Sequence, residues 1–208
     1  MPLLKHEPEI YPPDLFGPVA DEAGHAVAGN GAGPRRGAHR PAFGPWRVAH
    51  VRSRQEKRLA RHLLQSEVPF YLPQRQHRFR AGDRWRISHL PLFTGYVFFR
   101  GGADARVRAL QSNLVVQLLE VLAESELERQ LRSLWILQCS GAPLIPHPYL
   151  GPGDEVEVID GPLKGYQGRI LREKNRLRLV VSITLLRQAV AAEVDRAALA
   201  PAKLRKVG

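Results

Sequence analysis

The chain has 208 residues and a formal net charge of +11 at pH 7. Hydrophobic residues make up 44% of it and charged residues 25%, which is typical of a folded globular protein and excludes a wholly disordered one. It has neither an apolar run near the roughly 18 residues of a membrane span nor a signal-peptide pattern, and a single cysteine excludes an internal disulfide. We therefore expect a cytoplasmic protein without membrane contact, metal or cofactor.

Residues 1–45 are expected to form a disordered tail. They contain eight of the 17 prolines and seven of the 18 glycines. No helical or strand periodicity is visible between residues 17 and 45, so this part cannot bury enough apolar area to offset its ordering entropy. Residues 9–16 are an exception, because their apolar side chains either dock on a folded domain or remain occasional hydrophobic residues of the tail.

The apolar pattern of residues 46–138 predicts a first domain of helices and antiparallel strands. Ser53 with Glu56, and Ser125 with Glu128, each have the spacing of a capping box that opens a helix. The strands are predicted at 46–51, 70–72, 96–99 and 114–121, with a hairpin over 74–88 that turns at 81–83 and a short helix at 104–111.

Positive charge is concentrated in residues 46–100. This stretch holds twelve Arg and Lys residues, eleven of them arginine, against three acidic residues. The planar guanidinium suits phosphate and stacks on bases, so the concentration favours a nucleic-acid surface. The alternative is a solvated surface that serves only solubility.

A proline-spaced linker is predicted at residues 139–152, followed by a small β domain at 153–208. No helix or central strand could cross such a linker. The expected strands are 154–159, 168–174, 176–183 and 189–194, with a short one near Ala200. Five short strands of this kind can close into an SH3-like barrel.

Two sets of residues resemble the NusG family of transcription elongation factors. The first is Trp46, the stretch 70–73 (FYLP) and the stretch 91–99 (PLFTGYVFF), and the second is the KOW-like stretch 153–168 (GDEVEVIDGPLKGYQG). The resemblance implies an α+β fold in which an antiparallel sheet with helices, of the NusG N-terminal type, is linked to a small SH3-like KOW barrel. Because His50, Thr94 and Leu114 depart from the family pattern, the chain is most similar to specialised paralogues such as RfaH and the UpxY-type antiterminators.

The resemblance implies that the first domain binds the β′ clamp helices of RNA polymerase through an apolar depression on its sheet. The matching residues are His50, Phe93, Tyr96, Phe98 and Val121. Alternate residues of a strand face opposite sides, so Tyr96 and Phe98 share one face while Val97 and Phe99 share the other. The period does not decide which face is the outer one, and a place in the core is the alternative for Phe98.

The family faces upstream or non-template DNA with residues that match Arg52, Arg58, Arg80, Arg84 and Arg86. Trp85, between two of these arginines, is expected either to stack on an unpaired base or to cover the edge of the sheet.

In the KOW domain the resemblance implies binding of a ribosomal protein or the termination factor Rho through Tyr166, Leu185 and Leu186. A place in the barrel core is the alternative for these three residues. Arg187 stands where the family pattern has glycine.

We find no nucleophile with a base, no phosphate-binding glycine loop and no paired carboxylates, so an enzyme is not expected. The predicted function is that of a monomeric transcription elongation or antitermination factor, which suppresses pausing or termination. The alternative is a ribosome-associated RNA-binding protein that uses the KOW domain.

Overall fold

The computed structural model describes residues 9–17, 19–20, 26–27, 43–150, 155–159, 163–173, 176–194 and 204–207. It divides into two compact units, the first comprising residues 1–15 and 35–122 and the second residues 16–34 and 123–208. None of the helices in the described ranges has the length and apolar character needed to cross a membrane.

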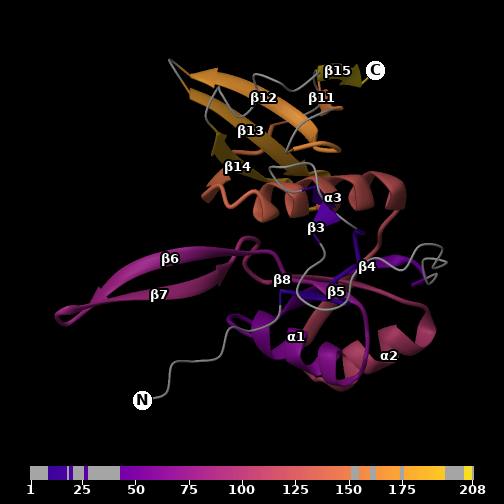
Figure 1. The fold of residues 1–208 in the computed structure, drawn as a ribbon. Helices are drawn as coiled ribbons and strands as arrows, with labels where there is room; N and C mark the ends of the chain where they lie inside the picture. Colours follow the sequence, from indigo (N-terminus) through magenta and orange to yellow (C-terminus); the bar gives the residue numbers. More distant parts are fainter. Residues whose placement is uncertain are drawn as a thin grey trace. The chain divides into compact units, whose positions relative to one another are not determined.

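The first unit contains a five-stranded antiparallel sheet (Figure 1). Its strands, in spatial order, are β1 (Ile10–Tyr11), β5 (Phe70–Tyr71), β8 (Tyr96–Arg100), β4 (Trp46–Val51) and β9 (Val115–Leu119). The register places His50 opposite Tyr96 and Val48 opposite Phe98. The predicted α+β class is therefore confirmed.

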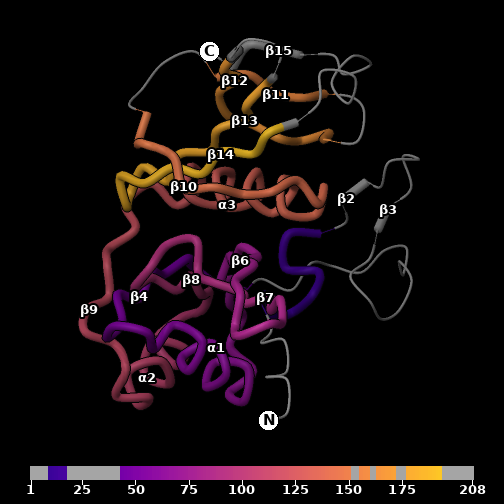
Figure 2. The backbone as a smooth tube through the Cα atoms, turned by 90° about the vertical axis from the view of Figure 1, so that its left-hand side faces the viewer, coloured from indigo at the N-terminus to yellow at the C-terminus, as the bar shows by residue number. Residues whose placement is uncertain are grey.

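Helices α1 (Glu56–Gln65) and α2 (Ala103–Gln111) lie on the same side of this sheet (Figure 2). The core beneath them includes Leu59 and Leu63 of α1, Val97 and Phe99 of β8, and Ala109 of α2. Their burial removes apolar surface from water, which is the main source of stability for this layer. Because side chains alternate along a strand, Tyr96 and Phe98 lie on the opposite face, as predicted.

A separate two-stranded hairpin, β6 (Gln74–Ala81) with β7 (Arg84–Pro91), extends away from the sheet (Figure 1). Gly82 in its turn adopts a φ of +61°, which glycine reaches without the strain of a Cβ atom. At the base of the hairpin, the Leu92 amide donates a hydrogen bond to the Pro73 carbonyl over 2.8 Å. The predicted hairpin and its turn are thus confirmed.

Residues 9–17 are part of the folded chain, which is the docked alternative that the sequence left open for residues 9–16. Ile10 and Tyr11 form β1, which pairs with Tyr71 and Phe70 at the edge of the sheet. Leu15 and Phe16 are each only 1% exposed. The apolar side chains of this stretch supply the buried area that offsets its ordering entropy. The rest of the predicted tail, apart from β2 (Val19–Ala20), β3 (Ala26–Val27) and residues 43–45, lies outside the described residues.

Burial also changes the chemistry of Glu9, which precedes β1. Burial raises the pKa of the Glu9 carboxyl from 4.5 to about 7, although the nearby positive charge of Lys57 acts in the opposite direction. The Glu9 carbonyl accepts a hydrogen bond from the Leu72 amide. This segment is therefore tied to the sheet by its backbone and carries a carboxyl group that ionises near neutral pH.

Both predicted capping boxes are wrong. Helix α1 begins at Glu56 and α3 (Glu124–Cys139) at Glu124, and in neither does a side chain cap the first turn. Arg54 has a φ of +60°, outside the helical region, and so the helix does not start there. Glu56 instead makes a contact described below.

The second unit consists of α3 and a six-stranded antiparallel sheet. The spatial order is β10 (Leu144–His147), β14 (Gln188–Val194), β13 (Arg176–Ile183), β12 (Gln167–Glu173), β11 (Glu155–Val158) and β15 (Leu204–Val207). β12, β13 and β14 match their predicted ranges closely. β10 lies inside the predicted linker, where its Pro146 is accommodated because β10 is an edge strand.

Helix α3 belongs to the second unit, whereas the sequence placed it in the first domain. The Gln130 amide donates to Thr184 Oγ1 over 2.8 Å and accepts from the Thr184 backbone amide over 3.1 Å. Ser133 Oγ accepts from the Gln167 amide over 3.0 Å. Polar residues of α3 thus bond to the start of β12 and to the short turn before β14. The domain boundaries at 138 and 153 stay a prediction.

Candidate functional site

The helix-free face of the first sheet carries a stacked pair of rings, His50 and Tyr96. These residues face each other across β4 and β8, and their ring centroids are 5.1 Å apart with an interplanar angle of 28°. Both side chains are half-buried. A stack of this kind presents flat, amphipathic area with few rotatable bonds, which favours binding of a partner at low entropic cost.

A second ring pair, Phe93 and Phe98, lies beside the first. Its centroids are 5.8 Å apart at an interplanar angle of 87°, an edge-to-face contact. Phe93 is 2% exposed and Phe98 is fully buried in the chain. The prediction that Phe98 shares a face with Tyr96 is confirmed, and its role as a polymerase contact stays a prediction.

The turn that carries Tyr96 into this face is fixed by Glu56. The buried Glu56 carboxylate accepts a hydrogen bond from the Gly95 amide over 2.7 Å. Gly95 has a φ of +85°, and a Cβ atom there would lie 3.5 Å from the His50 ring. Sequence reasoning missed this positioning role, because the spacing of Ser53 and Glu56 also fits a capping box. Gly95 in the sequence indicates a turn after Thr94, but it does not indicate that Glu56 is the partner of that turn.

The remaining polymerase-contact residue predicted from the resemblance, Val121, follows β9 and is half-buried. Leu119 of β9 pairs with Val48, which lies on the helix-free face. The structure therefore brings His50, Phe93, Tyr96 and Phe98 together and places Val121 just beyond the neighbouring strand.

All five arginines predicted to contact nucleic acid are exposed. They are Arg52, Arg58, Arg80, Arg84 and Arg86. Three of them belong to the hairpin, one follows β4 and one lies in α1. Trp85 is 64% exposed, so it does not cover a sheet edge. The Arg78 guanidinium lies over its ring, 5.2 Å from the centroid.

In the second unit, Tyr166 lies in the core. Its side chain is fully buried, and its hydroxyl donates to the Val180 carbonyl over 3.0 Å. The pKa of Tyr166 is raised well above its usual value, mainly by burial and to a smaller extent by the negative charge of Glu155. A Cβ atom at Gly168 would lie 2.4 Å from this hydroxyl, so glycine is required there. The partner role predicted for Tyr166 is not supported by this position.

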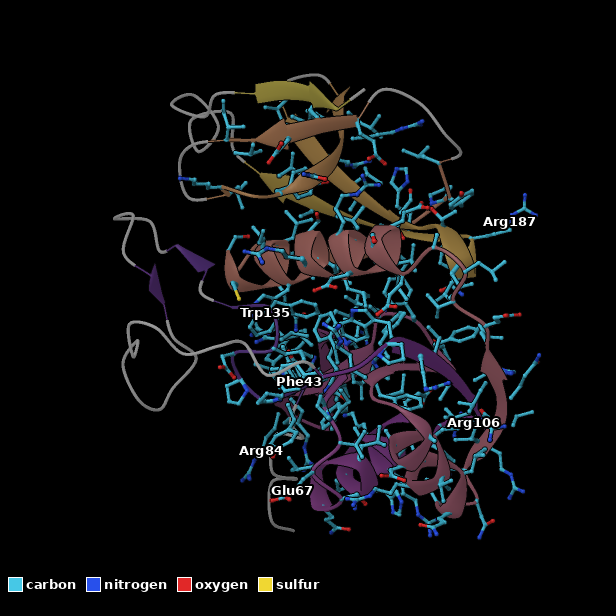
Figure 3. The ribbon with its side chains drawn as sticks, turned by 90° about the vertical axis from the view of Figure 1, so that its right-hand side faces the viewer. Phe43, Glu67, Arg84, Arg106, Trp135 and Arg187 are labelled. Atoms are coloured by element: carbon cyan, nitrogen blue, oxygen red, sulfur yellow. The ribbon has the colours of Figure 1, made fainter. Side chains whose placement is uncertain are left out.

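The other two residues predicted to bind a KOW partner lie in the turn before β14. Thr184–Leu186 form a short 3-10 helix, in which Leu185 is 36% exposed and Leu186 is half-buried. Arg187 follows with a φ of +51°, a left-handed conformation that favours glycine, and its side chain points outward (Figure 3). The backbone at Arg187 thus has a conformation that glycine adopts without strain.

Two family models match parts of the chain. Residues 44–127 match the family model described as transcription termination factor nusG, and residues 152–172 match the KOW motif. No curated protein sequence matches the chain.

One solved structure that is similar to the chain is described as domain interaction in Thermotoga maritima NusG. It shares 18% sequence identity with the chain and has a TM-score of 0.38, and the match covers 79% of this chain and 97% of that one. The matches to the two family models cover both predicted sequence signatures in the expected order, and the predicted resemblance to the NusG family is therefore confirmed.

Proposed function

We propose that this protein is a transcription elongation factor that binds the β′ clamp helices of RNA polymerase and the nucleic acid beside them. By favouring the elongating state of the polymerase it suppresses pausing or termination. The effect requires only a difference in affinity between polymerase states, and no catalytic step.

The observation that carries the polymerase part is the stack of His50 on Tyr96 on a sheet face that no helix of the first unit covers. Aromatic residues contribute large contact area at protein interfaces. Phe93 and Phe98 lie beside the stack and are buried in the free chain. A direct contact of a partner with Phe98 requires that this ring become accessible on binding.

Nucleic-acid binding is assigned to the exposed arginines. Arg84 and Arg86 flank Trp85 on the hairpin, whereas Arg52 follows β4 and Arg58 lies in α1. Each contact between an arginine and a phosphate releases a counterion, so we expect an affinity that falls steeply with salt concentration.

The KOW unit is proposed to bind a ribosomal protein or Rho through Leu185 and Leu186. The exposure of Leu185 in a short turn suits such a contact. Tyr166 then contributes by holding the sheet together rather than by touching the partner.

The polymerase contact is tested by a pull-down of purified RNA polymerase with the full chain. Tyr96→Ala and His50→Ala should each lower the retained polymerase about tenfold, a loss typical of a residue at the centre of an interface. Tyr149→Ala, which truncates a half-buried tyrosine of the second unit, is the matched control and should retain polymerase normally.

Pause assays on the same polymerase provide the functional readout. The wild-type chain should shorten pauses and the Tyr96→Ala variant should not. Retention of polymerase by both ring variants at the wild-type level would reject this face as the binding site.

A further inference from the structure

We propose that the two faces of the β6–β7 hairpin bind two different nucleic-acid strands at the same time, so that the hairpin recognises a branched junction. This inference rests on the proposed function and specifies the form of the nucleic acid. Three features of the hairpin support it: its register, the exposed side chains on each face, and its charge.

The register decides which residues share a face. Directly opposed residues of an antiparallel pair project to the same side, and successive residues alternate. Arg80 pairs with Trp85 and Arg78 with Ile87, which defines the tryptophan face. On the other side, Phe79 pairs with Arg86, Ala81 with Arg84 and His77 with Ser88, which defines the phenylalanine face.

The tryptophan face is built around an indole with a cation on it. Trp85 is 64% exposed, and Ile87 beside it is 57% exposed. The Arg78 guanidinium lies 5.2 Å from the Trp85 ring centroid, within the range of a cation–π contact. An exposed indole flanked by arginine is a suitable platform for a base, because every base offers a flat face for stacking.

The phenylalanine face has a platform of a similar kind. The rings of His77 and Phe79 are nearly parallel, with centroids 6.1 Å apart and an interplanar angle of 12°. Phe79 is 38% exposed. Arg84 and Arg86 are exposed on the same face, where they can contact phosphates beside a stacked base.

The charge of the hairpin favours nucleic acid over a protein as its partner. Residues 74–91 contain five arginines and one acidic residue, Asp83. Asp83 lies at the tip, 3.5 Å from the Arg80 guanidinium in an exposed ion pair. Both faces are therefore cationic, and each offers apolar rings to solvent that a folded core does not require. Exposed apolar groups of this kind indicate a binding surface.

Binding of two nucleic-acid strands is favoured over binding of one, because both faces of the hairpin are exposed. The hairpin is a two-stranded sheet of its own, and residues of both faces are exposed along 76–80 and 84–87. A short strand that lies on one face cannot reach the rings of the other. A junction whose two arms lie on opposite faces engages both platforms, and the second contact then forms at a high effective concentration.

The test compares two DNA probes of equal length and charge with the full chain. One probe is a fork with two single-stranded arms of about five nucleotides each. The other probe has a single unpaired tail of about ten nucleotides. Both are within the usual size of a site for single-stranded nucleic acid. We expect the fork to bind at least about tenfold more tightly than the tail, because only the fork occupies both faces at once.

Single-face variants sharpen the comparison. Trp85→Ala and Phe79→Ala should each weaken binding of the fork about tenfold. Either variant should weaken binding of the tail only about twofold, because the intact face still takes it. Leu122→Ala, which truncates a side chain that is 86% exposed outside the hairpin, is the control and should leave both affinities unchanged. Circular dichroism confirms that each variant is folded.

Equal affinity for fork and tail, or equal losses on both probes, would overturn the two-strand inference and leave the nucleic-acid role intact. Absence of binding to either probe at low salt would overturn that role as well, while the polymerase pull-down remains an independent test. The same probes made of RNA show whether the ligand is DNA or RNA. Tighter binding of the RNA fork than of the DNA fork supports the inference with RNA as the ligand.

Discussion

The five-stranded sheet and the β6–β7 hairpin are both rich in aromatic residues, but they differ in what covers those residues. Phe70, Val97 and Phe99 of the sheet are buried under α1 and α2. Phe79, Trp85 and Ile87 of the hairpin are exposed. The same residue types thus stabilise the fold where a second layer packs on them, and remain available to a ligand where none does.

The charge follows the same division. The hairpin carries five arginines on eighteen residues, whereas the sheet strand β8 carries one, Arg100. Arg100 is used inside the first unit, because its guanidinium donates to the Gly44 carbonyl over 3.0 Å and lies over the Trp46 ring. Arginine in the sheet is therefore structural, and arginine in the hairpin is proposed to be functional.

The largest expected effect contrasts the two regions directly. Phe99→Ala removes a fully buried ring and should lower the free energy of unfolding by about 3–5 kcal/mol. Trp85→Ala removes a larger but exposed ring and should change it by no more than about 0.5 kcal/mol. Urea denaturation of both variants measures this difference. A loss of several kcal/mol for Trp85→Ala would mean that the hairpin is part of the core.

The next effect concerns the turn between the two regions. Glu56→Ala leaves the buried Gly95 amide without its acceptor, which should cost about 1–3 kcal/mol of unfolding free energy. Because the turn positions Tyr96, polymerase binding should fall as well, whereas DNA binding by the hairpin should not. Unchanged stability in the same denaturation experiment would show that Glu56 does not hold the turn.

The edge of the sheet gives a pH-dependent effect. The Glu9 carboxyl has a pKa of about 7 in the folded chain and about 4.5 when unfolded, so the folded state holds its proton longer. The stability contribution of this carboxyl group is therefore complete below pH 4.5, declines as the pH rises and is lost above pH 7, with a total loss of about 3 kcal/mol. The stability difference between pH 5 and pH 8 should shrink in Glu9→Gln. An identical difference in both proteins would contradict the burial of this carboxyl group.

The smallest effect compares two turns. Gly82 in the hairpin and Arg187 before β14 both have positive φ, +61° and +51°, but only the second carries a side chain. Arg187→Gly relieves this strain and should raise the unfolding free energy by up to about 1 kcal/mol. Gly82→Ala should lower it by a similar amount. A lower stability of Arg187→Gly would show that the arginine side chain compensates for the strain.

The sequence predicted the regular parts of the fold well, because their signals are local. The strand 46–51, the hairpin turn at Gly82 and the helix before Gln111 all follow from periodicity and turn residues. The alternation of Tyr96 and Phe98 against Val97 and Phe99 was also predictable, since it depends only on the strand period.

The errors have a common cause, which is a contact distant in sequence. Glu56 bonds to Gly95 rather than to the start of its own helix, Ile10 pairs with Tyr71, and Gln130 bonds to Thr184. No local pattern reveals such a partner. The same limit applies to the candidate site, where the strand period could not show that Phe98 and Tyr166 are fully buried.

The central claim is that the sheet face and the hairpin bind two different partners. The most direct test is crosslinking of the full chain to non-template DNA in a purified elongation complex, with polymerase retention measured in parallel. We predict that Arg84→Glu with Arg86→Glu keeps polymerase and loses the DNA crosslink, whereas Tyr96→Ala loses both because the chain is no longer recruited. Wild-type DNA crosslinking by the double arginine variant would contradict the account.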